Sequence, residues 1–196
     1  MNPHIAQFPV NLNLAGKRVL LVGGGRIAYR KAEQLLPCQP LLTVMAPVVD
    51  ERFRTANVDI VEREYRELDV LGYSLVVTAT ANNAVDQQIF DECESLGIWV
   101  NSADDPDRCT FTLPASFRRG RLLVTSSTAG ASPAMSSWVR SSLEKLIGDE
   151  FGDAVELLAA KRAEFHAQGV STEDVDWAPL IAEALERVRA EKAATS

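Results

Sequence analysis

Residues 19–28 read VLLVGGGRIA, an apolar run that breaks into three glycines and resumes with a helical pattern. Gly23, Gly25 and Ala28 fit G-x-G-x-x-A, the strand–turn–helix pattern that receives the pyrophosphate of a dinucleotide. Gly23 permits the tight turn, Gly25 lets the backbone approach the phosphates, and Ala28 lets helix and strand pack closely. Exposed N–H groups at the helix start then face the negative charge. The pattern predicts a cofactor site, and the alternative is a glycine turn that binds nothing.

The residues after this turn continue as a β-α-β unit. A helix is predicted over about residues 26–36, with Pro37 as its stop, and residues 41–45 (LLTVM) read as the next strand. That strand ends without the acidic residue that would bind a ribose hydroxyl, and without an Arg or Lys that would select a 2′-phosphate. The choice between NAD and NADP is therefore open. Backbone contacts at Pro47 and Val48 are the expected replacement.

Length and composition predict a globular protein. A chain of 196 residues that is 46% hydrophobic can bury a core and form one domain or two small ones. It has no apolar stretch of about 18 residues or more and no signal pattern at its start, so we expect a cytoplasmic protein that does not enter membranes. Cys38, Cys93 and Cys109 are scattered, which favours buried thiols over disulfides, and His4 and His166 fit no metal-ligand pattern, so no metal site is predicted.

The net charge of −7 is concentrated near the end of the chain. The acidic excess falls mainly in residues 149–196, which predicts a solvated helical region and disfavours nucleic-acid binding. An acidic substrate would therefore need a local basic cluster. Residues 118–121 (RRGR), with Arg140 and Lys145, are the candidates, and a solvated turn is the alternative.

Further apolar runs alternate between strand and helix patterns. They predict strands at residues 59–61, 74–80 and 98–100 and a helix at residues 83–95. This alternation predicts an open parallel sheet, in which ligands bind beyond the carboxyl ends of the strands. Three such ends, at residues 23–25, 78–81 and 101–105, should meet at one edge, and we assign Thr80 to the cofactor there.

The third of these strand ends continues as residues 101–109 (NSADDPDRC), in the position expected for a catalytic loop. Two adjacent carboxylates, Asp104 and Asp105, can raise the pKa of one of them, which suits a general base. The alternative, favoured by the local sequence alone, is an Asp-Pro turn whose carboxylates cap a helix.

Five segments occur in the order typical of one family. They are residues 14–31, 101–105, 109–115, 119–120 and 127–134 (STAGASPA), followed by Arg140 and residues 143–144 on a helix. Over roughly residues 8–148 the chain thus resembles precorrin-2 dehydrogenases, which comprise the N-terminal domain of siroheme synthases and its stand-alone relatives. The chain departs from that family at Ala129, where a second glycine is usual, and at Ser137 and Trp138, where basic residues are common.

The resemblance implies a fold and an activity. Family members oxidise precorrin-2 to sirohydrochlorin with NAD⁺, on the route to siroheme and in some lineages to cobalamin or haem. The implied α/β fold is a Rossmann-type NAD-binding domain with a parallel sheet (residues 1–113), a dimerisation segment (residues 114–148) and a small C-terminal helical domain (residues 149–196). The resemblance also implies that these parts assemble as an intertwined homodimer.

The resemblance also assigns residues to roles. Asp104 matches the family's essential aspartate, the proposed base that takes a proton as hydride leaves for the nicotinamide. The cofactor contacts that the resemblance implies are Arg26, Ile27, Pro47 and Val48, which add to the glycine turn (Gly23, Gly24 and Gly25) and to Thr80. Because the tetrapyrrole substrate is rich in carboxylates, the expected substrate contacts are Asn101, Arg119, Arg121, Ser132 and Arg140. For Ser132 the alternative is the N-cap of a helix that starts at Pro133.

Three functions remain open at this stage. They are the dehydrogenase, a dehydrogenase that also inserts Fe²⁺ with the same aspartate, and a nucleotide-sensing module without catalysis. A short-chain reductase is disfavoured because no tyrosine lies in a Y-x-x-x-K pattern. In the helical region, core positions are expected rather than a cofactor motif at Leu157, Leu158, Ile181, Leu185 and Val188.

Overall fold

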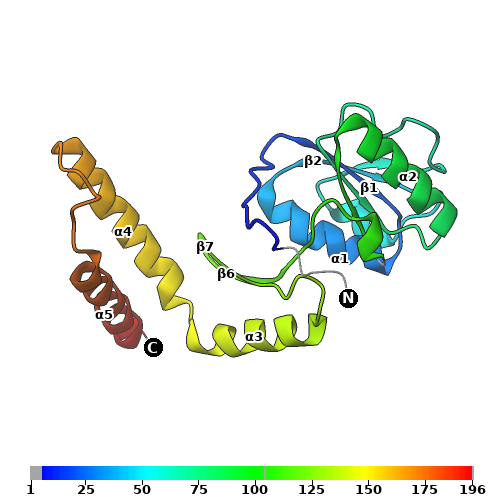
Figure 1. The fold of residues 1–196 in the computed structure, drawn as a ribbon. Helices are drawn as coiled ribbons and strands as arrows, with labels where there is room; N and C mark the ends of the chain where they lie inside the picture. The colour runs from blue at the N-terminus through cyan, green and yellow to red at the C-terminus, as the bar shows by residue number, and fades with distance from the viewer. Residues whose placement is uncertain (1–5, 104, 196) are drawn as a thin grey trace. The chain divides into compact units, whose positions relative to one another are not determined.

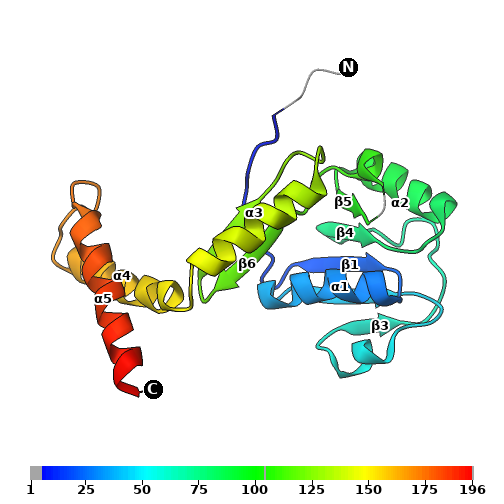
Figure 2. The same cartoon turned by 90° about the horizontal axis from the view of Figure 1, so that it is seen from below.

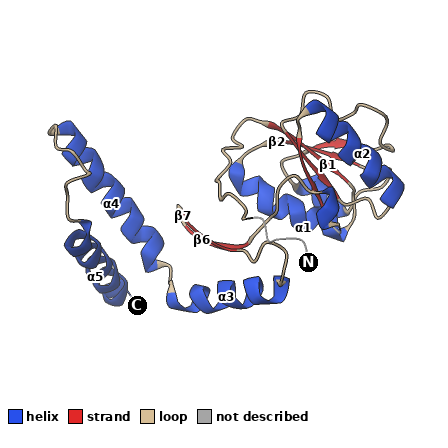
Figure 3. Ribbon diagram, viewed as in Figure 1, coloured by secondary structure: helices blue, strands red, loops and turns tan. Residues whose placement is uncertain are grey.

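The computed structural model describes residues 6–103 and 105–195. Met1–Thr112 and Leu113–Ser196 form two compact units, and each is considered by itself. Figures 1 and 3 show that the first unit layers helices on a sheet, whereas long helices dominate the second. In chain order, the elements of the first unit are β1 (Arg18–Val22), α1 (Arg26–Leu35), the 3-10 helix η1 (Leu36–Cys38), β2 (Leu41–Met45), the 3-10 helix η2 (Glu51–Thr55), β3 (Asp59–Val61), β4 (Leu75–Thr78), α2 (Asn83–Leu96), β5 (Trp99–Ser102) and the 3-10 helix η3 (Pro106–Arg108).

The sheet of the first unit is parallel throughout and has the strand order β3-β2-β1-β4-β5. Val22 at the end of β1 lies opposite both Met45 and Thr78, and Thr78 lies opposite Ser102. The carboxyl ends of β2, β1, β4 and β5 are therefore level with one another, as Figure 2 shows for the neighbouring strands. This register confirms the predicted open parallel sheet with its strand ends along one edge.

Alternate residues of the central strand β1 enter two separate cores. Val19 and Leu21 pack with Ala28 and Ala32 of α1, whereas Leu20 packs on the opposite face with apolar residues of α2. All four of the named β1 and α1 side chains on the first face are fully buried. After its exposed first residue, Arg18, the strand is apolar at every position, which is the pattern expected for a parallel sheet covered on both faces.

Both long helices of the first unit end as the sequence predicts. Helix α1 gives way at Leu35 to the 3-10 turn that contains Pro37. Helix α2 ends at Gly97, whose φ of 67° is the left-handed conformation that glycine adopts without strain. At its other end, the Asn82 side chain accepts hydrogen bonds from the N–H groups of Ala84 and Val85.

The second unit begins with an antiparallel strand pair and continues as helices. Its elements are β6 (Ala115–Arg119), β7 (Leu122–Ser126), α3 (Pro133–Leu146), α4 (Glu150–Ala167) and α5 (Trp177–Thr195). The turn between β6 and β7 packs on α4 at Gly152, where a Cβ atom would lie 2.7 Å from the carbonyl oxygen of Arg119. The glycine at position 152 therefore allows the helix to approach the strand turn closely.

Helices α4 and α5 pack together around a small core. Ala154, Ala184 and Val188 are buried, and the predicted core residues Leu157, Leu158 and Leu185 pack against them. The prediction is wrong for Ile181, whose side chain is 43% exposed although it lies on the same face of α5 as the buried Ala184 and Val188.

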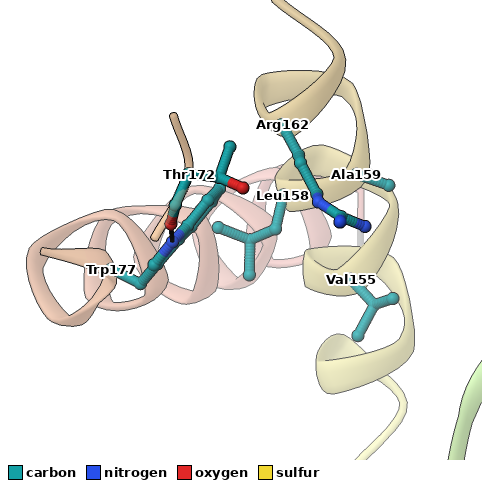
Figure 4. A pocket seen from close by; sticks show the side chains of 6 residues that line it. All are labelled: Val155, Leu158, Ala159, Arg162, Thr172 and Trp177. Carbon is teal, nitrogen blue, oxygen red and sulfur yellow. Dashed lines mark hydrogen bonds between the residues drawn. The ribbon is translucent and has the colours of Figure 1, made fainter. Parts of the chain in front are cut away.

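A shallow groove of about 360 Å³ also lies on this helix pair (Figure 4). Apolar side chains of α4, including Leu158, form one side, and Trp177 forms the other. The indole N–H of Trp177 donates a hydrogen bond of 3.1 Å to the carbonyl oxygen of Thr172. Across residues 6–103 and 105–195, no helix has the length and apolar character that crossing a bilayer requires.

Candidate functional site

The three consecutive glycines after β1 have different surroundings. Gly23 has a φ of 129°, and a Cβ atom on it would lie 2.3 Å from the carbonyl oxygen of Ala79. A Cβ atom on Gly24 would lie 2.1 Å from the carbonyl oxygen of Val48. A Cβ atom on Gly25 would meet no atom of residues 6–103 and 105–195 within 4 Å. Gly23 and Gly24 therefore let the loops after β4 and β2 approach the turn, whereas Gly25 faces open space, as a phosphate-binding glycine must.

The amino end of α1 has the features of an anion site. Gly25 is its N-cap residue and supplies no side-chain acceptor, and the first turn contains no acidic residue. By contrast, Ser132 caps α3 with its side chain. The first N–H groups of α1 are thus left to a ligand, and the helix dipole favours a negative one. Arg26 and Ile27, two predicted cofactor contacts, are exposed beside this end. The site fits a dinucleotide pyrophosphate.

The loop after β2 is attached to the glycine turn. The N–H group of Asp50 donates a 2.7 Å hydrogen bond to the carbonyl oxygen of Gly24. Pro47 and Val48, which the sequence assigns to the cofactor, are exposed on this loop, and 79% of Val48 is accessible. Their backbone is therefore open to a ligand at the carboxyl end of β2, where a dinucleotide places its adenosine ribose.

The loop after β4 uses Thr80 internally. Its hydroxyl donates a 2.8 Å hydrogen bond to the carboxylate of Asp86, and it accepts one from the N–H group of Asn82. Asp86 is 5% exposed, so this hydrogen bond satisfies a nearly buried carboxylate at the start of α2. The structure thus places Thr80 beside the glycine turn in a bonded loop, and its contact with the cofactor stays a prediction.

The segment that leaves β5 folds back against the strand. Asn101 is 5% exposed, and its side-chain amide donates 3.0 Å to the carbonyl oxygen of Phe111 and 3.4 Å to the sulfur of Cys109. Its side-chain oxygen accepts a hydrogen bond of 3.5 Å from the ammonium of Lys31 on α1. Asn101 therefore holds the returning chain in place, and its predicted contact with substrate stays a prediction.

The predicted base, Asp104, lies outside the described residues. Its neighbour Asp105 accepts a hydrogen bond of 2.9 Å from the N–H group of Asp107 and forms a 2.9 Å ion pair with Arg108. It thereby caps η3, which is the Asp-Pro turn that the local sequence favours. The general-base role was assigned to Asp104 and stays a prediction.

Buried polar groups line the strand ends beside this loop. The hydroxyls of Thr78 and Ser102, opposite one another at the ends of β4 and β5, are buried without a hydrogen-bond partner among the residues that the structure describes. The thiol of Cys109 donates to the carbonyl oxygens of Ser102 and Asp105, and burial raises its pKa above the ordinary range. The carboxyl ends of β4 and β5 are thus polar, although they lie within the sheet.

The three arginines predicted to bind substrate are all paired with acidic side chains in the second unit. Arg119 forms ion pairs with Asp149 at 3.1 Å and Glu144 at 3.7 Å, and it donates to the carbonyl oxygen of Ile147. Arg121 pairs with Glu156 and Arg140 with Glu144. The side chain of Arg119 is 21% exposed and is fixed in place by these contacts. The side chain of Arg121 is exposed, so it can exchange Glu156 for another partner.

Ser132 lies at the start of α3 and has the geometry of a helix N-cap, which the sequence offered as the alternative to a substrate contact. Its hydroxyl accepts a 3.2 Å hydrogen bond from the N–H group of Met135, which makes it the N-cap of the helix. Pro133 follows as the first helical residue. The capping role is therefore confirmed, and a direct contact of Ser132 with substrate stays a prediction.

Three charged residues near the strand ends are not predicted from the sequence. Asp50 and Arg52 follow the end of β2, and the carboxylate of Asp50 accepts hydrogen bonds from Arg52 at 2.8 and 2.9 Å. Lys31 on α1 reaches Asn101, 70 residues later in the chain. An acidic residue within a few positions of Ala46 was the available signal for Asp50, whereas no local pattern indicates the Lys31 contact.

The parallel sheet, its glycine turn and the uncapped helix start define a dinucleotide-binding protein. The comparisons agree, because the family model described as "Putative NAD(P)-binding" matches residues 10–115. The chain belongs to this NAD(P)-binding family, and it is similar to siroheme synthases and to a precorrin-2 dehydrogenase. The prediction of a nicotinamide dinucleotide as cofactor is thereby confirmed at the level of the family.

Individual relatives extend the likeness beyond the first unit. A siroheme synthase of Acinetobacter baylyi is 35% identical over 188 residues, which are 91% of this chain and 40% of the relative. A siroheme synthase of Photorhabdus laumondii is 34% identical over 149 residues, or 74% of this chain and 32% of the relative. This chain therefore spans well under half the length of these relatives. The solved structure of SirC, precorrin-2 dehydrogenase, is 26% identical with a TM-score of 0.71, covering 93% of this chain and 99% of that one.

Proposed function

We propose that the chain is an NAD-dependent dehydrogenase that oxidises precorrin-2 to sirohydrochlorin, a step towards siroheme. The observation that carries this proposal is the placement of the β5 loop, with the predicted base in its sequence, at the same sheet edge as the glycine turn. The likeness to SirC, precorrin-2 dehydrogenase, supports the substrate because it extends over nearly the whole length of both chains.

In the proposed reaction, the substrate loses a hydride and a proton. Bound at the glycine turn, NAD⁺ supplies the hydride acceptor. The chain must then supply a proton acceptor close to the sheet edge, and we assign that role to Asp104 in the loop between β5 and η3. Asn101 positions this loop through its bonds to Phe111 and Lys31.

Binding a carboxylate-rich macrocycle requires positive charge that can leave its present partners. Arg121 and Arg140 meet this need, because each pairs with a single acidic residue in the described part of the chain. Substrate carboxylates would replace Glu156 and Glu144 in charge-assisted hydrogen bonds. Arg119 is proposed to act indirectly by fixing the strand turn that carries Arg121.

We further propose that residues 114–148 form the contact between two copies and residues 149–196 a helical domain. Support comes from the exposed apolar side chains of α3, where Trp138 is 66% and Met135 52% exposed. The homodimer and a place in the cytoplasm are parts of this proposal.

The test is an anaerobic assay with purified protein, enzymatically made precorrin-2 and NAD⁺, followed by absorbance. We expect the spectrum of sirohydrochlorin to appear only when NAD⁺ is present. Asp104→Asn should abolish this conversion and leave NAD⁺ binding intact, whereas Asp105→Asn, its matched neighbour, should retain most of the activity. Full activity of Asp104→Asn would remove that residue from the mechanism, and absence of oxidation by wild type that binds NAD⁺ would favour a sensor. Fe²⁺ is then added after oxidation, and metal insertion faster than the spontaneous rate would show the alternative, a dehydrogenase that is also a chelatase.

A further inference from the structure

The loop after β2 carries an ion pair at the place where this fold receives the adenosine ribose of a dinucleotide. Strand β2 ends at Met45, level with the glycine turn, and the chain then stays against that turn up to Asp50. A Cβ atom on Gly24 would lie 2.9 Å from both the Ala46 side chain and the Cα atom of Val49, which shows how close this contact is. Residues 46–50 are therefore fixed relative to the phosphate-binding turn.

Asp50 is the first acidic residue after β2, and Arg52 is the first basic one. Their side chains are hydrogen-bonded to one another. The Asp50 carboxylate accepts three hydrogen bonds from Arg52: from the backbone N–H at 3.0 Å, from Nε at 2.9 Å and from Nη2 at 2.8 Å. The side chain of Asp50 is 26% exposed and that of Arg52 is 48% exposed. The pair is thus well ordered and still within reach of a ligand.

A stacking contact holds the guanidinium in this position. Its central carbon lies 4.1 Å from the ring centroid of Tyr29, a residue of α1. Tyr29 in turn packs edge-on against Phe53, the fully buried residue of η2. Arg52 is therefore restrained by a carboxylate on one side and an aromatic face on the other. The bonds from Arg52 lower the pKa of Asp50 to about 2, so the carboxylate is ionised at neutral pH.

We propose that Asp50 makes this site select NAD over NADP, by holding Arg52 in an internal ion pair and by placing a negative charge at the carboxyl end of β2. The inference rests on the proposed dinucleotide binding and adds the residue that chooses between the two cofactors. A carboxylate at this strand end accepts hydrogen bonds from a ribose diol and repels a 2′-phosphate. An unpaired arginine there would instead bind that phosphate through two parallel hydrogen bonds.

The experiment measures binding of NAD⁺ and NADP⁺ to the full chain by calorimetry, without turnover. Wild type should bind NAD⁺ more tightly than NADP⁺. Asp50→Asn should shift the affinity ratio towards NADP⁺ by about tenfold, because it removes the charge and weakens the hold on Arg52. Asparagine also caps helices well, so η2 should keep its start, and thermal unfolding checks this.

Two further variants separate the causes. Asp50→Asn combined with Arg52→Ala should lose the gain in NADP⁺ affinity, because no guanidinium remains to bind the phosphate. Glu51→Gln removes a carboxylate that is 88% exposed, one residue away, and should leave the ratio as in wild type. An equal shift in Glu51→Gln would reduce the effect to general electrostatics and overturn the assignment to Asp50.

The remaining outcomes distinguish this inference from the proposed function. If wild type binds NAD⁺ and Asp50→Asn leaves the affinity ratio unchanged, the inference fails and the proposed function stands. A wild type that prefers NADP⁺ overturns the inference and also replaces NAD⁺ by NADP⁺ as the cofactor of the proposed dehydrogenase. If wild type binds neither cofactor, the proposed function itself fails, and the inference fails with it.

Discussion

At the scale of single residues, two neighbouring glycines of the turn, Gly24 and Gly25, predict different effects of the same substitution on stability and on cofactor binding. Gly24→Ala should lower the free energy of unfolding by about 1–3 kcal/mol, because its Cβ atom would lie 2.1 Å from a backbone oxygen. Gly25→Ala should change stability by less than about 0.5 kcal/mol, because its Cβ atom meets no atom of the described residues, and should weaken NAD⁺ binding. Urea unfolding and a cofactor titration check both. Equal loss of stability in the two variants would contradict this division of roles.

Another prediction at this scale concerns Cys93, a fully buried residue of α2 that belongs to the core on that face of the sheet. Burial raises the pKa of its thiol from 9.0 to about 12. Between these values the unfolded chain loses the proton first, so stability should fall with rising pH, with a limiting slope of about 1.4 kcal/mol per pH unit. Cys93→Ala should be less stable at pH 8 and show a shallower fall above pH 9 in urea unfolding series. An unchanged slope would mean that another group causes it.

Individual residues also show where prediction from sequence stops. Gly23, Gly25 and the cap at Ser132 are predictable because each role depends on a few adjacent positions. The pairing of Lys31 with Asn101 depends on how α1 lies across the sheet, and local sequence does not encode that geometry. Asp50 was missed because the bend of the chain after β2 moves the acidic position a few residues beyond the strand end.

At the scale of secondary-structure elements, Arg119 fastens the β6–β7 turn to the junction between α3 and α4. Arg119→Ala should lower the free energy of unfolding by about 1–3 kcal/mol, because it removes the hydrogen bond to the carbonyl oxygen of Ile147 and the ion pair with Asp149. Arg121→Ala is the matched control, since its exposed ion pair should contribute less than about 0.5 kcal/mol. Urea unfolding measures both. A larger loss of unfolding free energy in Arg121→Ala than in Arg119→Ala would show that Arg119 does not fix the β6–β7 turn.

Elements were predictable where a strong pattern coincided with a clear stop. The helix predicted over residues 83–95 is Asn83–Leu96, because both its Asn cap and its glycine end are visible in the sequence. The strand predicted over residues 74–80 is shorter, Leu75–Thr78, because the chain turns into the Thr80 loop before its apolar residues end. Within the helical region, spacing predicts which face of α5 meets α4, since Ala184 and Val188 are buried on it, but it does not tell how far along the helix the contact extends, and Ile181 on that face is exposed.

At the scale of the whole molecule, the exposed face of α3 predicts self-association. Met135, Trp138 and Leu146 lie on one side of the helix and are 52%, 66% and 74% exposed. Wild type should sediment as a dimer in analytical ultracentrifugation, and Trp138→Glu should shift it to the mass of one chain because a charge would enter an apolar contact. Ser137→Glu, at the adjacent exposed position off that side, should remain dimeric. A monomeric wild type would contradict the proposed dimerisation segment.

The return of the chain after β5 also governs how the protein can fold while it is being synthesised. The N–H group of Thr110 donates to the carbonyl oxygen of Val100, and the Thr110 hydroxyl accepts from the N–H group of Val100. The next residue, Phe111, packs against the α1 face of the sheet. Once Phe111 has left the ribosomal tunnel, every strand of this sheet is therefore outside the ribosome. So is the segment around Thr110 that is hydrogen-bonded to the edge strand β5. The cofactor unit can close at that point, while the helical unit is still being translated.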